Sequence, residues 1–182
     1  QYADLASVAM ERANANARIT RQNQLLHYLA DTSKALLGQL HLDKVLQDIL
    51  DKMILLVDLP HGFVCLFEGD ISEGTIQAGR GRFSEKTGSF VKMKGSLLNE
   101  AVRTGETAIL TNDAINLYTK NDSLLTGVTM IVETPLRVEG KIIGLIALTA
   151  FGEPVLMDEE KISAVDQLAT VASIAVKNAL HH

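Results

Sequence analysis

The sequence predicts an α+β fold in which helices pack on an antiparallel sheet. Two extended segments, 130–138 and 141–151, are joined by Glu139-Gly140, and a two-residue connection containing glycine is typical of a β-hairpin. Apolar residues at helical spacing lie before the predicted strands, at 43–56, and after them, at 158–180. We therefore expect two helices, several strands, a short helix, the hairpin and a closing helix, in that order.

The chain begins with a segment that favours a long helix. Residues 2–37 contain no Pro or Gly and are rich in Ala, and Gly38 is expected to end the helix. Residues at alternating spacings of three and four form a line that is mostly apolar with polar interruptions, a pattern that resembles a coiled-coil seam. Two arrangements stay open, an arm that pairs with a second copy or a helix folded back over its own domain.

A second helix and a central strand follow. Asp43 is a candidate cap, and the apolar side of this helix consists of Val45, Leu46, Ile49, Met53 and Leu56. Residues 62–68 are apolar on both sides, which indicates a strand in the middle of a sheet, and 71–79 is a weaker strand.

The middle of the chain reads as short elements. We expect a glycine-rich turn at Gly79-Arg80-Gly81-Arg82, then a third strand with Val91 and Met93 inward and Lys92 and Lys94 in solvent. A short helix at 97–103 would begin after Ser96 and end at Gly105, and 107–110 would be a strand. Residues 112–126 are polar and irregular, as in a segment that wraps over something.

The end of the chain predicts a covered strand and a covered helix. Residues 142–148 are apolar on both faces, so this half of the hairpin is expected inside the sheet. Asp158, Glu159 and Glu160 place three carboxylates at the start of the closing helix, where the helix dipole favours them. Apolar residues occupy much of the circumference of that helix, which must therefore be covered on more than one side.

Composition excludes several classes of function. The 182 residues are 47% hydrophobic and 21% charged, with 17 Lys+Arg against 22 Asp+Glu, so binding nucleic acid through a basic surface is not expected. Cys65 is the single cysteine, which excludes internal disulfides, iron–sulfur clusters and thiolate-rich zinc sites. No apolar run reaches the ~20 residues of a membrane span and no signal peptide opens the chain, so a cytoplasmic location is expected. Because the sequence begins with Gln1 and not with Met, we expect it to be a piece of a longer polypeptide.

Three motifs carry a family resemblance. The segment from Glu133 to Leu148 resembles the paired strands of GAF domains, and the helix from Asp158 to Ala179 is similar to their closing helix. The segment Ala101-Val102-Arg103-Thr104-Gly105-Glu106 matches their short helix and glycine turn. The resemblance covers residues 25–180, with the three motifs in the expected order.

The resemblance implies a fold and an organisation. It implies an antiparallel sheet of five or six strands, with the terminal helices on one face and a small-molecule pocket on the other, under residues 96–126. The expected parts are an N-terminal signalling helix at 1–37, a GAF core at 38–157 and a C-terminal signalling helix at 158–182 that also packs on the core. Apolar walls and polar partners of such a pocket would be Phe67, Arg82, Phe83, Leu98, Ile115, Tyr118, Thr126, Met130, Val132 and Glu133.

The residues argue against cofactors and metals. Cys65 lies mid-strand between apolar neighbours and reads as a small core residue, whereas methionine sulfoxide reduction by GAF domains uses several cysteines. No histidine lies between Gly62 and Leu180 to ligate haem or a metal, and His181 and His182 are either native or a tag remnant. A covalent bilin would need a cysteine in the pocket helix or loops. We expect no cofactor.

We therefore expect a non-enzymatic regulatory sensor that binds a small molecule and signals through dimeric helices to an output domain of the parent chain. The expected parallel homodimer would use Leu5, Val8, Ile19, Leu26, Leu29, Val165, Ala172, Ala175 and Ala179. One alternative is a structural dimerisation module without a ligand. A weaker one is a cyclic-nucleotide site, because the family's Asn-Lys pair is absent after the hairpin and Asp158-Glu159 is first a helix cap. An enzyme is weakest, since no nucleophile–base pair is evident.

Overall fold

The computed structural model describes residues 2–37, 42–116 and 124–180, with the backbone alone for 28–37 and 116. The chain divides into two compact units, Gln1–Gly38 and Gln39–His182. The first unit holds helix α1, Tyr2–Leu37, whose 36 residues extend over about 54 Å at the rise of an α-helix. The predicted helix is confirmed, and Leu5, Ile19 and Leu26 on its apolar line are each more than half exposed. Pairing with a second copy and folding back both stay predictions.

The second unit is built on one six-stranded sheet in the order β3-β2-β1-β6-β5-β4. All neighbouring strands are antiparallel, which confirms the predicted α+β class and strand number. Strands β1 and β6, both apolar on two sides, form the central pair, as expected. The strands are β1 (His61–Phe67), β2 (Glu73–Arg80), β3 (Phe90–Lys92), β4 (Ala108–Thr111), β5 (Met130–Val138) and β6 (Lys141–Ala150).

The hairpin of β5 and β6 forms at the predicted turn. Glu139 and Gly140 have φ of 52° and 79°, so both central residues of the turn are left-handed, as a type I′ turn requires. Val138 pairs with Lys141, and the register shifts by a bulge between Leu136 and Arg137.

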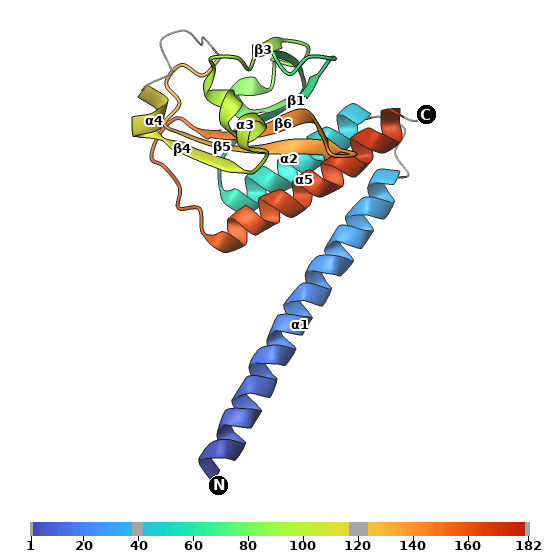
Figure 1. Ribbon diagram of the computed structural model, residues 1–182, viewed down its shortest axis with the longest axis vertical. Helices are drawn as coiled ribbons and strands as arrows, with labels where there is room; N and C mark the ends of the chain where they lie inside the picture. The colour runs from blue at the N-terminus through green and yellow to red at the C-terminus, as the bar shows by residue number, and fades with distance from the viewer. Residues whose placement is uncertain (1, 38–41, 117–123, 181–182) are drawn as a thin grey trace. The chain divides into compact units, whose positions relative to one another are not determined.

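Helices α2 (Leu42–Val57) and α5 (Glu159–Leu180) pack on one face of the sheet and on each other (Figure 1). The buried side of α2 matches the predicted apolar line except at Leu56, which is exposed because the helix turns that position away from the sheet. Asp158 caps α5 as expected, since its Oδ1 accepts a hydrogen bond of 2.8 Å from the Lys161 amide. Asp43 lies inside the first turn of α2.

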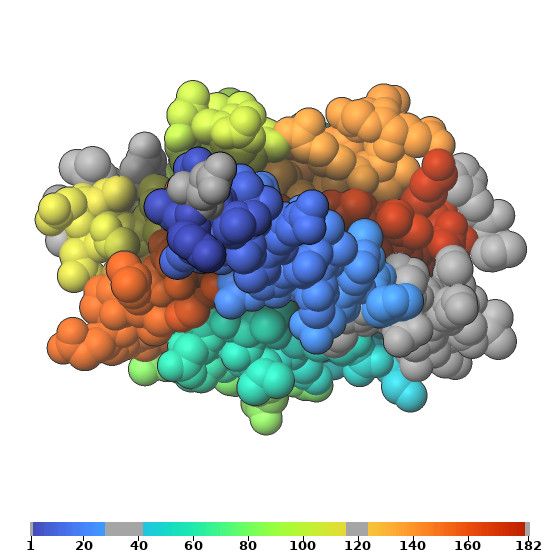
Figure 2. Space-filling model, turned by 90° about the horizontal axis from the view of Figure 1, so that it is seen from below, coloured from blue at the N-terminus to red at the C-terminus, as the bar shows by residue number. Residues whose placement is uncertain are grey.

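Short elements cover the opposite face. They are two 3₁₀ turns, η1 (Gly81–Phe83) and η2 (Leu97–Asn99), and the helices α3 (Glu100–Thr104) and α4 (Asn112–Asn116). Figure 2 shows the α3 region (yellow-green) and α2 (turquoise) on opposite sides of the domain. Ser96 and Gly105 bound η2 and α3 as predicted, with the Leu98 amide donating to Ser96 Oγ. The core on this face consists of Phe63, Cys65, Ile76, Phe83, Val91, Met93, Leu97, Leu98, Ala101, Ile115, Leu125, Val128, Ile131, Leu145 and Ala147.

Two expectations about the middle of the chain are corrected. The glycine-rich turn is shorter than predicted, because Gly79 and Arg80 still belong to β2 and the Arg80 guanidinium donates to the Asp51 carboxylate on α2, at 2.8 Å. The segment expected to be irregular begins with the helical turn α4, whose Ile115 is buried in the core. Residues 117–123 lie outside the described residues.

Replacing Gly144 by Ala is expected to destabilise the domain by about 2–4 kcal/mol. In the central pair, a Cβ on Gly144 would lie 2.7 Å from a methyl carbon of Leu66 and clash with the Cys65 carbonyl, so β1 and β6 would have to separate. Urea denaturation measures the loss. Gly152→Ala is the control, since its Cβ would meet nothing within 4 Å, and equal midpoints for both variants would contradict the prediction.

Candidate functional site

One hollow opens on the face covered by the short elements, and we call it the basic hollow. It has a volume of about 470 Å³. Among the described residues its lining contains two cationic side chains and no carboxylate, which favours an anionic ligand. The lining residues are Arg82, Phe83, Lys86, Ser89, Phe90, Leu124, Thr126 and Phe151.

Arg82 is held in position by aromatic neighbours. Its guanidinium carbon lies 3.9 Å from the centroid of the Phe151 ring, and its backbone amide donates to Nδ1 of His61 at 3.1 Å. The His61 ring meets Phe151 edge-on, with centroids 5.1 Å apart. Burial, and then the charge of Arg82, lower the pKa of His61, which favours the neutral ring that accepts this bond. Stacking covers one face of the guanidinium and leaves its in-plane N–H groups for hydrogen bonds.

The structure brings some of the predicted pocket residues together. Arg82, Phe83 and Thr126 line the basic hollow. Phe67, Leu98 and Ile115 lie on the same face but are packed in or against the core cluster beneath it, and Tyr118 lies outside the described residues. Sequence reasoning did not place the aromatic partner Phe151, which ends the second predicted strand of the hairpin, or the second cation Lys86 in the pocket.

Met130 and Val132 are not brought to this face. Side chains alternate along β5, and Ile131 belongs to the core on the side of the short elements. Met130 and Val132 alternate with Ile131, so their side chains point to the opposite face. Thr134 points the same way as they do, and its hydroxyl is hydrogen-bonded to Thr107, which in turn bonds Asp166 on α5. Met130 and Val132 are buried under the helices and we leave them out of the site.

Glu133 lies on the pocket-side face of β5 but under α3, away from the basic hollow. Its side chain is fully buried, and Oε1 accepts a hydrogen bond of 2.9 Å from the Ala101 amide. Among the described residues, Oε2 has no hydrogen-bond partner. Burial raises the pKa of Glu133 to about 7, against the opposing effect of hydrogen bonds from the amides of Ala101 and Glu100.

Cys65 lacks the surroundings of a nucleophile. It is buried in β1, and burial, with a further contribution from the charge of Glu133, raises the pKa of its thiol to about 12. The thiol is therefore protonated at neutral pH. Across residues 2–37, 42–116 and 124–180, His, Cys, Asp and Glu form no group of three placed to bind a metal ion.

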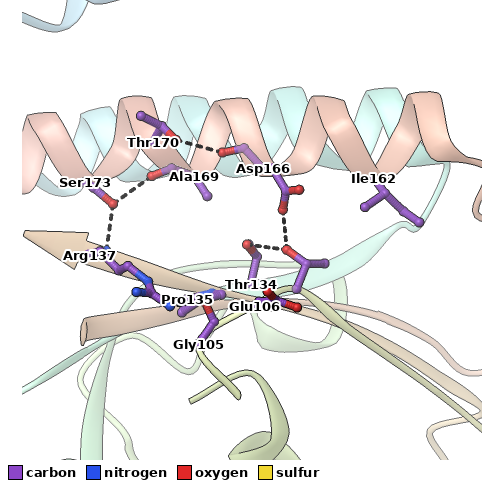
Figure 3. A pocket seen from close by; sticks show the side chains of 11 residues that line it. Gly105, Glu106, Thr134, Pro135, Arg137, Ile162, Asp166, Ala169, Thr170 and Ser173 are labelled. Carbon is purple, nitrogen blue, oxygen red and sulfur yellow. Dashed lines mark hydrogen bonds between the residues drawn. The ribbon is translucent and has the colours of Figure 1, made fainter. Parts of the chain in front are cut away.

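A second hollow, of about 540 Å³, lies on the opposite face between α5, β5 and the turn from α3 to β4 (Figure 3). We call it the hydroxyl groove. Sequence reasoning missed it, because its lining comes from three segments far apart in the chain. The groove is lined by Gly105, Glu106, Thr107, Thr134, Pro135, Arg137, Ile162, Asp166, Ala169, Thr170 and Ser173.

The polar groups of the hydroxyl groove bind one another. Thr107 Oγ1 lies 2.8 Å from Thr134 Oγ1 and donates to the Asp166 carboxylate on α5 (Figure 3). Ser173 Oγ accepts from the Arg137 amide at 3.0 Å and donates to the Ala169 carbonyl. The groove therefore joins α5 to β5, and the smaller basic hollow is the better candidate for a ligand.

The arrangement of strands and helices is that of a known family. The GAF domain family matches residues 39–177, and the chain belongs to that family. GAF domains are sensory and regulatory modules of signalling proteins. A comparison with curated proteins finds no match. In the part of the chain that the structure describes, each helix is too short or too polar to span a membrane.

Solved structures share the fold at low identity. The GAF domain of an Acinetobacter phosphoenolpyruvate-protein phosphotransferase has a TM-score of 0.71 at 15% identity, covering 87% of this chain and 96% of that one. Free methionine-R-sulfoxide reductase from Neisseria meningitidis, in complex with its substrate, has a TM-score of 0.67 at 11% identity, covering 84% of this chain and 88% of that one. The chromophore-binding domain of a bacteriophytochrome from R. palustris has a TM-score of 0.66 at 12% identity, covering 88% of this chain and 62% of that one.

Replacing Ser173 by Ala is expected to lower the free energy of unfolding by about 1 kcal/mol, because the Arg137 amide loses its partner in a partly buried hydrogen bond. Thr170→Ala is the matched control. Its hydroxyl is exposed and bonds only one turn back along α5, to the Asp166 carbonyl. Urea denaturation would contradict this account of the groove if the two variants lost the same stability.

Proposed function

We propose that this chain is a non-enzymatic sensor module that binds a small anionic molecule in the basic hollow and passes its state to an output domain through paired helices. The observation that carries the proposal is the Arg82 guanidinium, stacked on Phe151 beside the second cation Lys86. A stacked guanidinium with free in-plane donors matches the geometry of a carboxylate or phosphate. A ring on the ligand would have Phe90 and Leu124 for apolar contact.

Relatives of the fold support a small-molecule ligand. The reductase structure holds its substrate, and the bacteriophytochrome domain binds a chromophore. The anionic character of the ligand comes from this chain's own residues. The absence of catalysis is supported by Cys65, whose buried thiol is protonated and is the single cysteine of the sequence.

The proposed dimer rests mainly on α1. Leu5, Val8, Ile19 and Leu26 are exposed apolar residues at coiled-coil spacing, and a parallel pair would bury them. On α5, Val165 and Ala172 are buried within the domain and serve its core. A partner would reach the exposed side of that helix, where Ile174 and Ala179 lie. The side chain of Leu29 lies outside the described residues.

The ligand is tested by thermal shift with small carboxylates, phosphates and cyclic nucleotides, each beside a neutral analogue. We expect at least one anion to raise Tm by roughly 2–4 °C at one hundred times its Kd, and its neutral analogue to have no effect. Arg82→Ala should abolish the shift. Lys94→Ala, which removes one positive charge away from the hollow, should keep it. If no anion binds, the alternative of a structural dimerisation module is favoured.

The dimer is tested by light scattering at micromolar concentration. Ile19→Glu with Leu26→Glu should convert the dimer to a monomer, because like charges would meet at the seam. Ala17→Glu with Gln24→Glu adds the same charge at the same spacing on the other side of α1 and should stay dimeric. A wild-type monomer, or a seam variant that remains a dimer, would exclude α1 as the interface.

A further inference from the structure

The Glu133 carboxyl lies where α3 meets the sheet, and neither the basic hollow nor the hydroxyl groove uses it. Its fully buried side chain projects from β5 towards the first turn of α3, where the Ala101 amide donates to Oε1 at 2.9 Å. Ala101 itself is buried in the core cluster, so this hydrogen bond lies within apolar surroundings. It links the short α3 to the sheet.

The two oxygens of the Glu133 carboxyl differ in their hydrogen bonding. Among the residues that the structure describes, Oε2 has no partner, and bulk water does not reach a fully buried side chain. Burying a neutral acid with one unpartnered oxygen costs a modest free energy, whereas burying an ionised carboxylate in the same place costs much more. The amides of Ala101 and Glu100 favour the charged form, but burial with no partner for Oε2 outweighs them, so the protonated form is favoured while α3 is packed on the sheet.

The charged groups around Glu133 do not relieve this cost. On α3, Glu100 adds negative charge, and the nearby Arg103 is paired with Glu100, at 2.5 Å. From β1, the Cys65 thiol, which is uncharged at neutral pH, faces it. On the neighbouring strands the residues opposite Glu133 are Ala108 of β4 and Ala147 of β6. Within the described residues, no cation compensates an ionised Glu133.

We propose that Glu133 is a proton-linked contact that holds α3 on the sheet when it is neutral and releases α3 when it ionises. Release lets water reach the carboxylate, which removes the cost of burying the charge. The raised pKa of about 7 places this change near neutral pH. The Arg137 guanidinium donates to the carbonyl of Gly105 at the end of α3, so the movement would also reach the edge of the hydroxyl groove.

The proposal predicts the sign of the pH dependence. In the folded protein Glu133 keeps its proton up to about pH 7, whereas in the unfolded chain it loses the proton near its ordinary pKa of 4.5. The stabilisation that Glu133 contributes is therefore fully present below pH 4.5, decreases above that value and is lost as the pH rises through 7. The contribution of Glu133 to the folding equilibrium constant should fall about 70-fold between pH 5 and pH 8.5. Glu133→Gln should lack this decrease, so its stability relative to wild type should increase with pH.

Two measurements test the proposal. Carboxyl ¹³C NMR of wild-type protein should give a Glu133 midpoint near pH 7, and this needs no variant that folds. Tryptic cleavage after Arg103, in α3, should speed up between pH 6 and 8.5 in wild type relative to Glu133→Gln at the same pH. Glu106→Gln, which removes an exposed carboxylate from the turn after α3, should behave as wild type. A Glu133 midpoint below pH 5, or a cleavage ratio that does not change with pH, would overturn the proposal.

Discussion

The fold depends on the close pairing of two strands that are apolar on both faces. Strands β1 and β6 approach so closely at Gly144 that a methyl group there would collide with Leu66. Because both faces of this pair exclude water, the sheet must be covered twice. Two long helices, α2 and α5, cover one face, and a layer of 3₁₀ turns and five-residue helices covers the other.

The two covering layers differ in how they are held. The helices α2 and α5 bury continuous apolar sides and support each other. Helices as short as α3 and α4 have little stability of their own, so specific contacts must position them. Glu133 binds the first turn of α3, and Phe151 positions Arg82 in η1. The candidate ligand site and the proton-linked contact thus belong to the layer that is less strongly held.

Local patterns predicted most of the fold, because periodicity and turn chemistry act over a few residues. The hairpin at Glu139-Gly140, the central pair and the long helices follow from such patterns. The site was predicted less well, because strand alternation separates Met130 and Val132 from Ile131 without saying which set faces the helices. The stacking of Arg82 on Phe151 and the bond from Ala101 to Glu133 join residues 69 and 32 positions apart, and no local pattern encodes them.

Native-state hydrogen exchange under increasing denaturant tests most directly whether the two layers differ in stability. Amides of β1 and β6 should exchange only through global unfolding, with the full denaturant dependence. Amides of η2 and α3 should exchange through smaller openings, at lower free energy and with weak denaturant dependence, while α5 follows the sheet. Equal free energies of exchange for α3 and the central strands would contradict the account.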